Sequence, residues 1–313
     1  MSPAPALFDL QVNGFAGVDF QQADLALVDL RRAVEALRDR ETHRLLLTLI
    51  TDGIEALCAK FARLETFRRA DPLIAETVCG YHLEGPWLSP VAGFCGAHPP
   101  EKMGAPSLAD FARLQDAAGG NIRLVTLAPE WPGSAEFIAS ATAQGVVVSL
   151  GHTDASEAQI DEAIRAGARL CTHLGNGVPV TLPRHDNVMQ RLLARDELIA
   201  CLIPDGVHLP PFTLRNFFRA KPPGKVLLTT DAMAAAGAPE GRYRIGALEV
   251  ESRGGVVRMP GAANFAGSCL TPDRGVANAA RWLGVPEVEA RALFSTQVAG
   301  IFGVDLPLLR ATA

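Results

Sequence analysis

Short apolar segments alternate eight times with longer amphipathic segments between residues 7 and 235, and this alternation constrains the fold more than any other feature. Almost continuous apolar strands joined by helices are typical of a parallel sheet whose outer face is covered. Eight such units in roughly 230 residues favour a closed (β/α)8 TIM barrel, an α/β fold, over an open doubly wound sheet. The predicted strands span residues 7–13, 44–50, 78–84, 122–127, 146–150, 169–173, 199–203 and 225–230. The predicted helices span residues 25–38, 54–69, 108–118, 135–144, 157–166, 188–194 and 211–219.

The pattern changes after residue 235. Residues 242–260 alternate polar and apolar side chains around Gly254-Gly255, which predicts a hairpin. Residues 272–283 and 286–302 predict two C-terminal helices within 271–303. The 48% of apolar residues suffice for one large core, so we expect a single domain over residues 1–313.

Charge and composition exclude several classes of protein. The net charge is −5, and Arg68-Arg69 is the one basic cluster, which argues against a nucleic-acid partner. No apolar stretch is long enough to cross a bilayer, and the N-terminus lacks the pattern of a signal peptide. Six scattered cysteines without a CxxC pair are typical of reduced thiols. We therefore expect a cytoplasmic protein with no membrane partner.

Polar residues gather where the predicted strands end. In (β/α)8 barrels the chemistry lies at the carboxyl ends of the strands, so these side chains are expected at one rim. No GxGxxG motif follows the first strand, which argues against a dinucleotide at this rim. The residues in question are Gln11, Asn13, His82, Glu84, His152, His173, Asp205, His208 and Asp231.

Glu84, His152 and His173 offer one carboxylate and two imidazoles, a ligand set that suits a catalytic zinc-like ion with an open position. Such an ion lowers the pKa of bound water and polarises a carbonyl, and Asp231 would take the proton. Each residue also has a structural alternative. Glu84 before Gly85-Pro86, and Asp231 after its strand, are each suited to capping the segment that follows. His82 is equally suited to a supporting and to a structural role, whereas His43 and His185 are predicted to be structural.

The motifs at these strand ends resemble those of the N-acetylglucosamine-6-phosphate deacetylases, which belong to the amidohydrolase superfamily. They occur in the same order as in that family and include Asp9-Leu10-Gln11-Val12-Asn13-Gly14, His82-Leu83-Glu84-Gly85-Pro86 and Gly151-His152-Thr153. The other segments that carry the resemblance lie at residues 96–98, 172–176, 205–208, 230–232 and 266–268.

The resemblance implies hydrolysis of the N-acetyl amide of N-acetylglucosamine 6-phosphate to glucosamine 6-phosphate and acetate. It implies metal ligation by Glu84, His152 and His173, and acid–base catalysis by Asp231. His208 would contact the sugar and polarise the amide carbonyl, and Arg184 would bind the phosphate. The full set of implied substrate contacts is Ala97, His98, Asn176, Gly177, Arg184, Asp205, His208, Ala266 and Gly267.

Gln11 and Asn13 lie where many amidohydrolases carry two histidines. Amide side chains are poor metal ligands beside imidazoles, so they are predicted to support the site or to mark the place of a lost second ion. The resemblance therefore implies one divalent ion per subunit. Zn²⁺ is the expected ion, with Fe²⁺, Co²⁺ and Mn²⁺ as alternatives, and a homodimer is the expected assembly.

The sequence departs from the family pattern in three places. The small β-sandwich of the family is predicted to be absent or reduced to the hairpin at 242–260. Gly177-Val178 replaces the usual Ala-Met, and Arg184-His185-Asp186-Asn187 replaces the usual Arg-Glu-Pro-Gly. Two alternatives therefore remain open: hydrolysis of a different N-acetylated sugar or small amide, and a non-catalytic barrel that binds an amino sugar.

Overall fold

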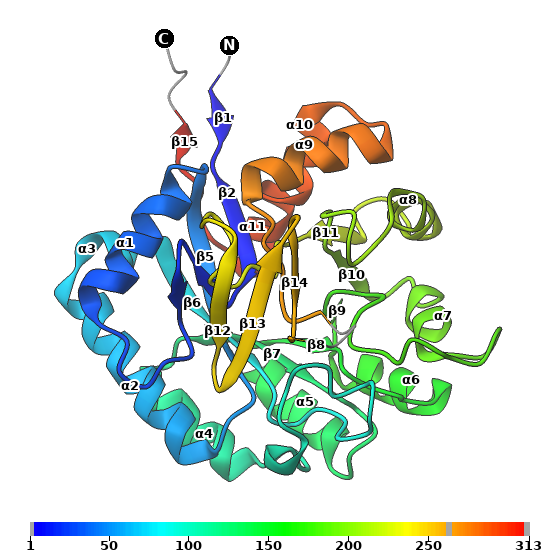
Figure 1. The fold of residues 1–313 in the computed structure, drawn as a ribbon. Coiled ribbons are helices and arrows are strands. Elements are labelled where there is room, and N and C mark those ends of the chain that lie inside the picture. Colours follow the sequence, from blue (N-terminus) through cyan, green and yellow to red (C-terminus); the bar gives the residue numbers. More distant parts are fainter. Residues whose placement is uncertain (1–2, 261–264, 310–313) are drawn as a thin grey trace.

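The computed structural model describes residues 3–260 and 265–309, and its centre is a barrel of eight parallel strands (Figure 1). The strands follow one another around the barrel in chain order, with β2 and β11 at the two ends of the hydrogen-bonded sheet. The predicted barrel is thus confirmed. Its strands are β2 (Leu7–Val12), β5 (Thr42–Ile50), β6 (Val78–Glu84), β7 (Ile122–Leu127), β8 (Val147–Leu150), β9 (Leu170–Cys171), β10 (Ile199–Leu202) and β11 (Val226–Leu228).

Side chains and one backbone bridge close the seam between β2 and β11. The buried Asp9 carboxylate accepts hydrogen bonds from the hydroxyls of Thr229 (2.6 Å) and Thr230 (2.5 Å) on the far side of the seam. Above it, the Asn13 N–H donates to the Ala232 carbonyl at 2.7 Å. The barrel is therefore a closed structure, although β2 and β11 share no continuous ladder.

Helices cover the outside of the barrel because each buries an apolar stripe. In α1 (Leu27–Arg38), for example, Leu30, Val34 and Leu37 are buried at helical spacing. The other covering helices are α2 (Ile54–Ala70), α3 (Pro72–Thr77), α4 (Leu108–Ala117), α5 (Ser134–Ala143), α6 (Glu157–Ala166), α7 (Val188–Leu193) and α8 (Pro211–Ala220). None of the helices in the described part of the chain is long and apolar enough to span a membrane.

The C-terminal helices close the floor of the barrel. The prediction of one helix over 286–302 was wrong, because the structure has two, α10 (Glu287–Leu293) and α11 (Thr296–Phe302), after α9 (Pro272–Leu283). Between α10 and α11 the Phe294 carbonyl accepts a hydrogen bond from the backbone N–H of Phe8. The Phe302 ring then packs on Phe8 with 5.7 Å between ring centroids.

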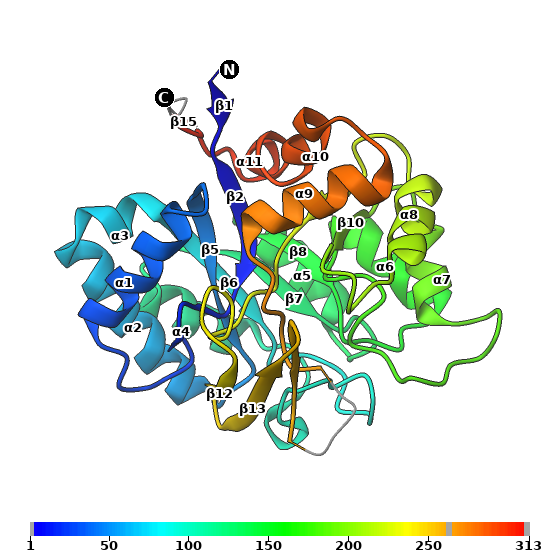
Figure 2. The same ribbon diagram turned by 45° about the horizontal axis from the view of Figure 1, so that its top comes forward.

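A three-stranded antiparallel sheet lies over the open rim (Figures 1 and 2). It contains β12 (Gly241–Ile245), β13 (Leu248–Arg253) and β14 (Val256–Arg258), so the predicted single hairpin was wrong by one strand. The turn at Gly246 is fastened to the rim, since the Gly246 N–H donates to Asp19 Oδ2 at 2.9 Å. The interpretation of this sheet as a remnant of the family's small β-sandwich stays a prediction.

Three short elements complete the described chain. The ribbon of β1 (Ala4–Pro5) and β15 (Leu308–Leu309) brings the first and the last described strand side by side. A second ribbon, β3 (Gly14–Phe15) with β4 (Val18–Asp19), follows β2, and a 3₁₀ turn η1 (Pro100–Lys102) lies in the loop after β6.

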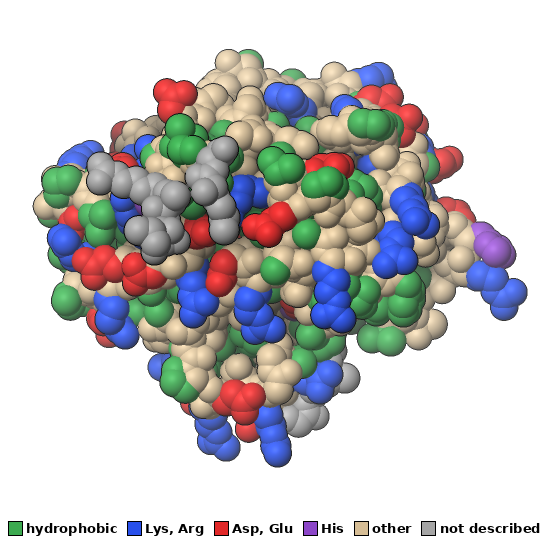
Figure 3. Space-filling model, turned by 90° about the horizontal axis from the view of Figure 1, so that it is seen from above, with side chains coloured by type: hydrophobic (Ala, Val, Ile, Leu, Met, Phe, Trp, Pro, Cys, Tyr) green, Lys and Arg blue, Asp and Glu red, His purple; other side chains and the backbone are tan. Residues whose placement is uncertain are grey.

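Acidic and basic side chains are interspersed over the face of the molecule that is seen from above in Figure 3.

Candidate active site

Three residues predicted to carry the chemistry have left-handed backbone conformations. His152, His173 and Asp231 have φ values of 52°, 28° and 50°, and each lies two or three residues after a barrel strand. Such values are rare for residues with a Cβ and are often found at functional sites. Each turns the chain sharply at the strand end and leaves its side chain facing the same cavity.

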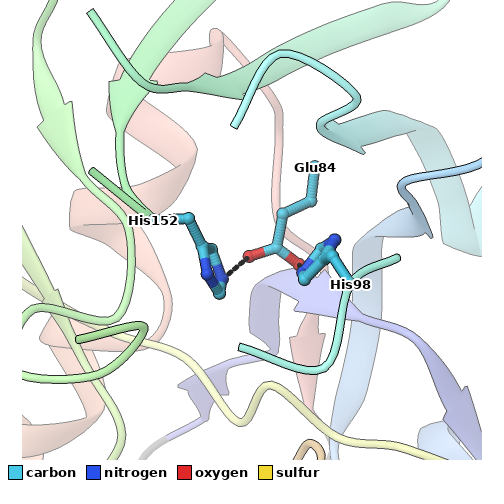
Figure 4. Close-up of side chains that lie close together, drawn as sticks. All are labelled: Glu84, His98 and His152. Atoms are coloured by element: carbon cyan, nitrogen blue, oxygen red, sulfur yellow. Dashed lines mark ion pairs between the residues drawn. The ribbon is translucent and has the colours of Figure 1, made fainter. Parts of the chain in front are cut away.

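The carboxylate of Glu84 lies at the centre of a group of histidines. Its Oε1 is 3.0 Å from His173 Nε2 and 3.4 Å from His152 Nε2. Its Oε2 is 3.7 Å from His98 Nε2, so His98 and His152 approach the carboxylate from two sides (Figure 4). The ligand atoms of Glu84, His98 and His152 all lie within 4.8 Å of one another. The sequence predicts His98 only as a substrate contact, whereas the structure also places it among the possible ligands.

The donor atoms of this cluster fit a divalent ion. His152 Nδ1 lies 2.8 Å from the Phe94 carbonyl, and since a carbonyl only accepts, Nδ1 carries the proton and Nε2 is free to ligate. Burial, and then the neighbouring His152, lower the pKa of His98 to about 3, which keeps that imidazole neutral. Although burial alone would raise it, the close contacts with the His152 and His173 imidazoles hold the pKa of Glu84 well below its usual value. A neutral imidazole and an ionised carboxylate are the forms that ligate metals.

Asp231 lies across the same cavity and is held by Asn13. Asn13 Nδ2 donates to Asp231 Oδ1 at 2.7 Å, so the predicted supporting position contacts the predicted acid–base residue. Burial, followed by the negative charge of Glu84, raises the pKa of Asp231 to about 7. A carboxyl group with a pKa near neutrality is suited to accept and return a proton. Gln11 is fully buried in β2, and its amide atoms have no hydrogen-bond partner among the described residues.

Two glycines confine the His152 ring. A Cβ on Gly96 would lie 2.8 Å from His152 Cε1, and a Cβ on Gly177 would lie 2.7 Å from His152 Nδ1. Both glycines have positive φ values. The close approach of both glycines therefore confines the imidazole near Nδ1 and Cε1, and Gly177, which departs from the family pattern, takes part in it.

The cavity above these residues has a volume of about 630 Å³. Apolar side chains that the sequence analysis missed also line it, among them Phe265, Ile245 and Met189. Phe265 directly precedes the Ala266-Gly267 motif, a signal that could have been used, whereas Ile245 arrives with the sheet over the rim. The predicted residues that line the cavity are Asn13, Glu84, Ala97, His98, His152, His173, Asn176, Gly177, His208, Asp231 and Gly267.

Other predicted residues lie behind or outside the cavity wall. Asp205 supports His208, with 2.6 Å between its Oδ2 and His208 Nδ1, and Ala266 is buried. Arg184 is exposed and is not among the lining residues. It belongs to the segment between β9 and α7, which extends away from the barrel (Figures 1 and 2). Arg184 thus does not face the cavity, and its role as a phosphate contact stays a prediction.

A closed parallel barrel that gathers a carboxylate, three imidazoles and an opposing aspartate at its carboxyl rim defines a hydrolase of the amidohydrolase class. No protein-family model matches the chain. Individual relatives do match over most of its length. The N-acetylglucosamine-6-phosphate deacetylase of Bos taurus is 34% identical over 321 residues, covering 95% of this chain and 74% of the relative. That of Bacillus subtilis is 32% identical over 273 residues, covering 87% and 68%.

A solved structure of the Mycobacterium smegmatis N-acetyl-D-glucosamine-6-phosphate deacetylase, a mutant in complex with N-acetyl-D-glucosamine-6-phosphate, superposes with a TM-score of 0.87. It is 34% identical, and the match covers 99% of this chain and 80% of that one. The N-acetylgalactosamine-6-phosphate deacetylase of Escherichia coli O157:H7 is 33% identical over 302 residues, covering 96% and 78%. The chain belongs to the N-acetylglucosamine-6-phosphate deacetylase family.

Proposed function

We propose that the protein hydrolyses the N-acetyl amide of N-acetylglucosamine 6-phosphate, giving glucosamine 6-phosphate and acetate. The observation that carries the proposal is the cluster of Glu84 and its histidines facing Asp231 across one cavity. Family membership supports the same chemistry, because the relatives are named for this reaction.

Asp231 is the residue that moves the proton. It takes a proton from the attacking water as the water oxygen bonds to the acetyl carbon. It then gives that proton to the amine nitrogen as the carbon–nitrogen bond breaks, so the carboxylate is restored. A pKa raised to about 7 suits both steps, and Asn13 keeps the carboxylate oriented through the 2.7 Å hydrogen bond.

His208 is placed to stabilise the developing oxyanion. Its Nδ1 is engaged by Asp205, which leaves Nε2 as the atom that faces the substrate. We propose that the Nε2–H group of His208 donates to the amide carbonyl oxygen. A donor of this kind typically accelerates acyl transfer by about 10²–10³-fold.

We further propose that Glu84, His152 and His173 hold one divalent ion, with His98 as an additional candidate ligand. Zn²⁺ is the proposed ion, and Fe²⁺, Co²⁺ and Mn²⁺ are the alternatives. Such an ion supplies polarisation of the amide carbonyl and activation of water when it is bound.

A second substrate has specific support. The Escherichia coli O157:H7 relative is named for N-acetylgalactosamine 6-phosphate, which differs from the glucosamine compound at one hydroxyl. The changed segment at residues 184–187 leads into α7, and its residues 184–186 are exposed. Hydrolysis of another N-acetylated sugar is therefore the second candidate.

The test is acetate release from the two phosphorylated sugars and from free N-acetylglucosamine, before and after chelation. We expect turnover of N-acetylglucosamine 6-phosphate that is lost on chelation and restored by Zn²⁺. Asp231→Asn should keep the metal content of the wild type and lose about 10²–10⁴-fold in kcat. Full activity after complete metal removal, or in Asp231→Asn, would overturn the assignment. Absence of acetate release from every sugar would favour the non-catalytic barrel.

Assembly and location stay proposals. We propose a homodimer, as resemblance to the family implies, and a cytoplasmic protein whose partner is a small amino-sugar phosphate. Light scattering on the purified chain tests the first, since a mass of one chain at all concentrations contradicts it.

A further inference from the structure

Four buried polar side chains form a continuous run of hydrogen bonds behind the wall of the cavity. His82 Nε2 lies 2.8 Å from Thr126 Oγ1, and Thr126 Oγ1 lies 2.6 Å from Thr172 Oγ1. Ser149 Oγ lies 2.6 Å from the same Thr172 oxygen. These four residues, named here the buried polar chain, are all buried, and none of them lines the cavity. Neither the proposed proton transfer nor the candidate ligand set uses any of them.

The buried polar chain runs across the strands whose carboxyl ends present the candidate ligands. In the register of the barrel, Thr126 of β7 is paired with Glu84 of β6 on one side and with Ser149 of β8 on the other. Thr172 follows the last residue of β9 and directly precedes His173. The buried polar chain therefore ties together, at one level of the barrel, the strand ends from which the ligands extend.

Two of its threonines also support the backbone in front of His152. A Cβ on Gly151 would lie 2.9 Å from Thr172 Cβ and 3.0 Å from Thr126 Cγ2, so the Gly151 backbone packs directly on both side chains. The residues that follow Gly151 and Thr172 are His152 and His173, whose φ values are 52° and 28°. Strained conformations of this kind persist only where the surroundings fix them. The two threonines thus contact the chain immediately before both strained imidazole carriers.

Thr126 is the link that makes the run continuous. It joins His82 to the hydroxyls of Thr172 and Ser149, so an apolar side chain at position 126 removes a partner from two buried polar groups at once. Buried polar groups that are all paired favour one arrangement of side chains, whereas a buried group left without a partner drives the structure to rearrange. A rearrangement here would reach the peptides on either side of the ligands.

We infer that the buried polar chain positions the imidazoles of His152 and His173 for a divalent ion, with Thr126 as its central link. The inference rests on the proposed function, because that function places an ion between these imidazoles and Glu84. Since no member of the chain lines the cavity, each acts through the backbone of the ligands and is a positioning residue. Of the two roles predicted for His82, this assigns the supporting one.

The test titrates the apoproteins of Thr126→Val, Thr126→Ser and Thr42→Val with Zn²⁺. Valine keeps the shape of threonine without the hydroxyl, whereas serine keeps the hydroxyl. Thr42 begins β5 at the opposite end of the barrel, and its buried hydroxyl has no partner among the described residues, so Thr42→Val is the matched control. We expect Thr126→Val to weaken Zn²⁺ binding roughly 10-fold, as loss of ligand support usually does. Thr126→Ser and Thr42→Val should bind Zn²⁺ like the wild type.

Two further readouts separate positioning from a general loss of stability. The absorption bands of bound Co²⁺ depend on ligand geometry, so they should shift in Thr126→Val and stay unchanged in Thr126→Ser and Thr42→Val. At saturating Zn²⁺, Thr126→Val should lower kcat for N-acetylglucosamine 6-phosphate and leave KM unchanged, because the buried polar chain does not line the cavity.

Wild-type Zn²⁺ affinity in Thr126→Val would overturn the inference, and so would an equal loss in Thr42→Val or a failure of Thr126→Ser to recover binding. If Thr126→Val does not fold, Ser149→Ala decides in its place, because it removes only the end of the buried polar chain. Wild-type affinity in Ser149→Ala then contradicts the inference. A wild type that binds Zn²⁺ and releases no acetate contradicts the proposed function, while the role of Thr126 is still measured. A wild type that binds neither Zn²⁺ nor Co²⁺ contradicts the inference itself.

Discussion

The imidazole of His152 is positioned by backbone as much as by side chains. A Cβ at Gly96, where φ is +58°, would lie 2.8 Å from His152 Cε1. We expect Gly96→Ala to displace the ring and to weaken metal binding roughly 10- to 100-fold, the usual effect of disturbing the support of a ligand. Titration of the apoprotein with Zn²⁺ measures this effect.

Gly104→Ala is the matched control, because Gly104 belongs to the same loop and a Cβ there has open space. It should bind Zn²⁺ like the wild type. If Gly96→Ala binds as tightly as Gly104→Ala, the ring is not confined in the way the contact distances indicate.

At the scale of single residues, sequence reasoning works where a side chain follows a strand. Glu84, His152, His173 and Asp231 were placed correctly at one rim, because the carboxyl ends of parallel strands meet there. Their chemical roles stay predictions. The sequence did not predict the proximity of His98 to Glu84, because His98 lies in a long loop whose path depends on tertiary contacts such as that with Thr51 (2.9 Å).

At the scale of elements, the seam between β2 and β11 contains a titrating group. Burial, only partly offset by hydrogen bonds from Thr229 and Thr230, raises the pKa of Asp9 to about 6 from 3.8. Between these values the folded protein binds more protons than the unfolded chain, so the free energy of unfolding falls as pH rises through about 4 to 6. The stabilisation is complete below the unfolded pKa and is lost above the folded one, a loss of roughly 3 kcal/mol.

Asp9→Asn removes this titration. Urea unfolding at several pH values should show that the difference in unfolding free energy between wild type and Asp9→Asn changes by roughly 2 kcal/mol between pH 4 and pH 6.5. The exposed Asp24 provides the control Asp24→Asn, which should give no such change. A difference that is constant with pH would contradict the assignment to Asp9.

For elements with strong local periodicity, such as β6, β7 and α6, the first and last residues were predicted to within a few positions. The short helix α3 was missed although a local signal exists. Asp71 caps it by accepting from the Leu73 and Ile74 N–H groups, and Pro72 occupies the first turn. At the break between α10 and α11 the Phe294 carbonyl accepts a hydrogen bond from Phe8, a contact that residues 286–302 alone do not predict, although Ser295 at the N-cap of α11 is a local signal.

At the scale of the whole molecule, the ligand cluster joins distant parts of the chain. Glu84 ends β6, His98 lies in the loop that follows, and His152 and His173 follow β8 and β9. An ion bound only by the folded state at 100 times its Kd stabilises by about 2.7 kcal/mol. We expect Zn²⁺ to raise the Tm of the apoprotein by about 5 °C, as measured by scanning calorimetry.

Glu84→Gln removes the central carboxylate and should abolish most of this shift. The same increase in Tm in the wild type and in Glu84→Gln would show that Zn²⁺ acts at another place. His43→Ala, which changes a histidine outside the cavity-lining residues, should keep the wild-type response.

The overall architecture followed from the alternation of strand and helix, because eight parallel units have few ways to bury both faces. The sheet over the rim could not be predicted in the same way. Its inner side chains, such as Ile245 and Val250, meet partners near residue 233, and their positions depend on the barrel being complete.

Closure of the barrel brings together two residues that are far apart in the sequence. Asn13 extends from the first barrel strand and Asp231 from the last, and their hydrogen bond spans 218 positions of sequence. Directly beneath it, Asp9 joins the same two strands. A barrel without β11 and the residues that follow it contains His98, His152 and His173 but lacks the Asn13–Asp231 hydrogen bond. The Asn13–Asp231 hydrogen bond therefore requires that the first and the last strand of the barrel are both in place.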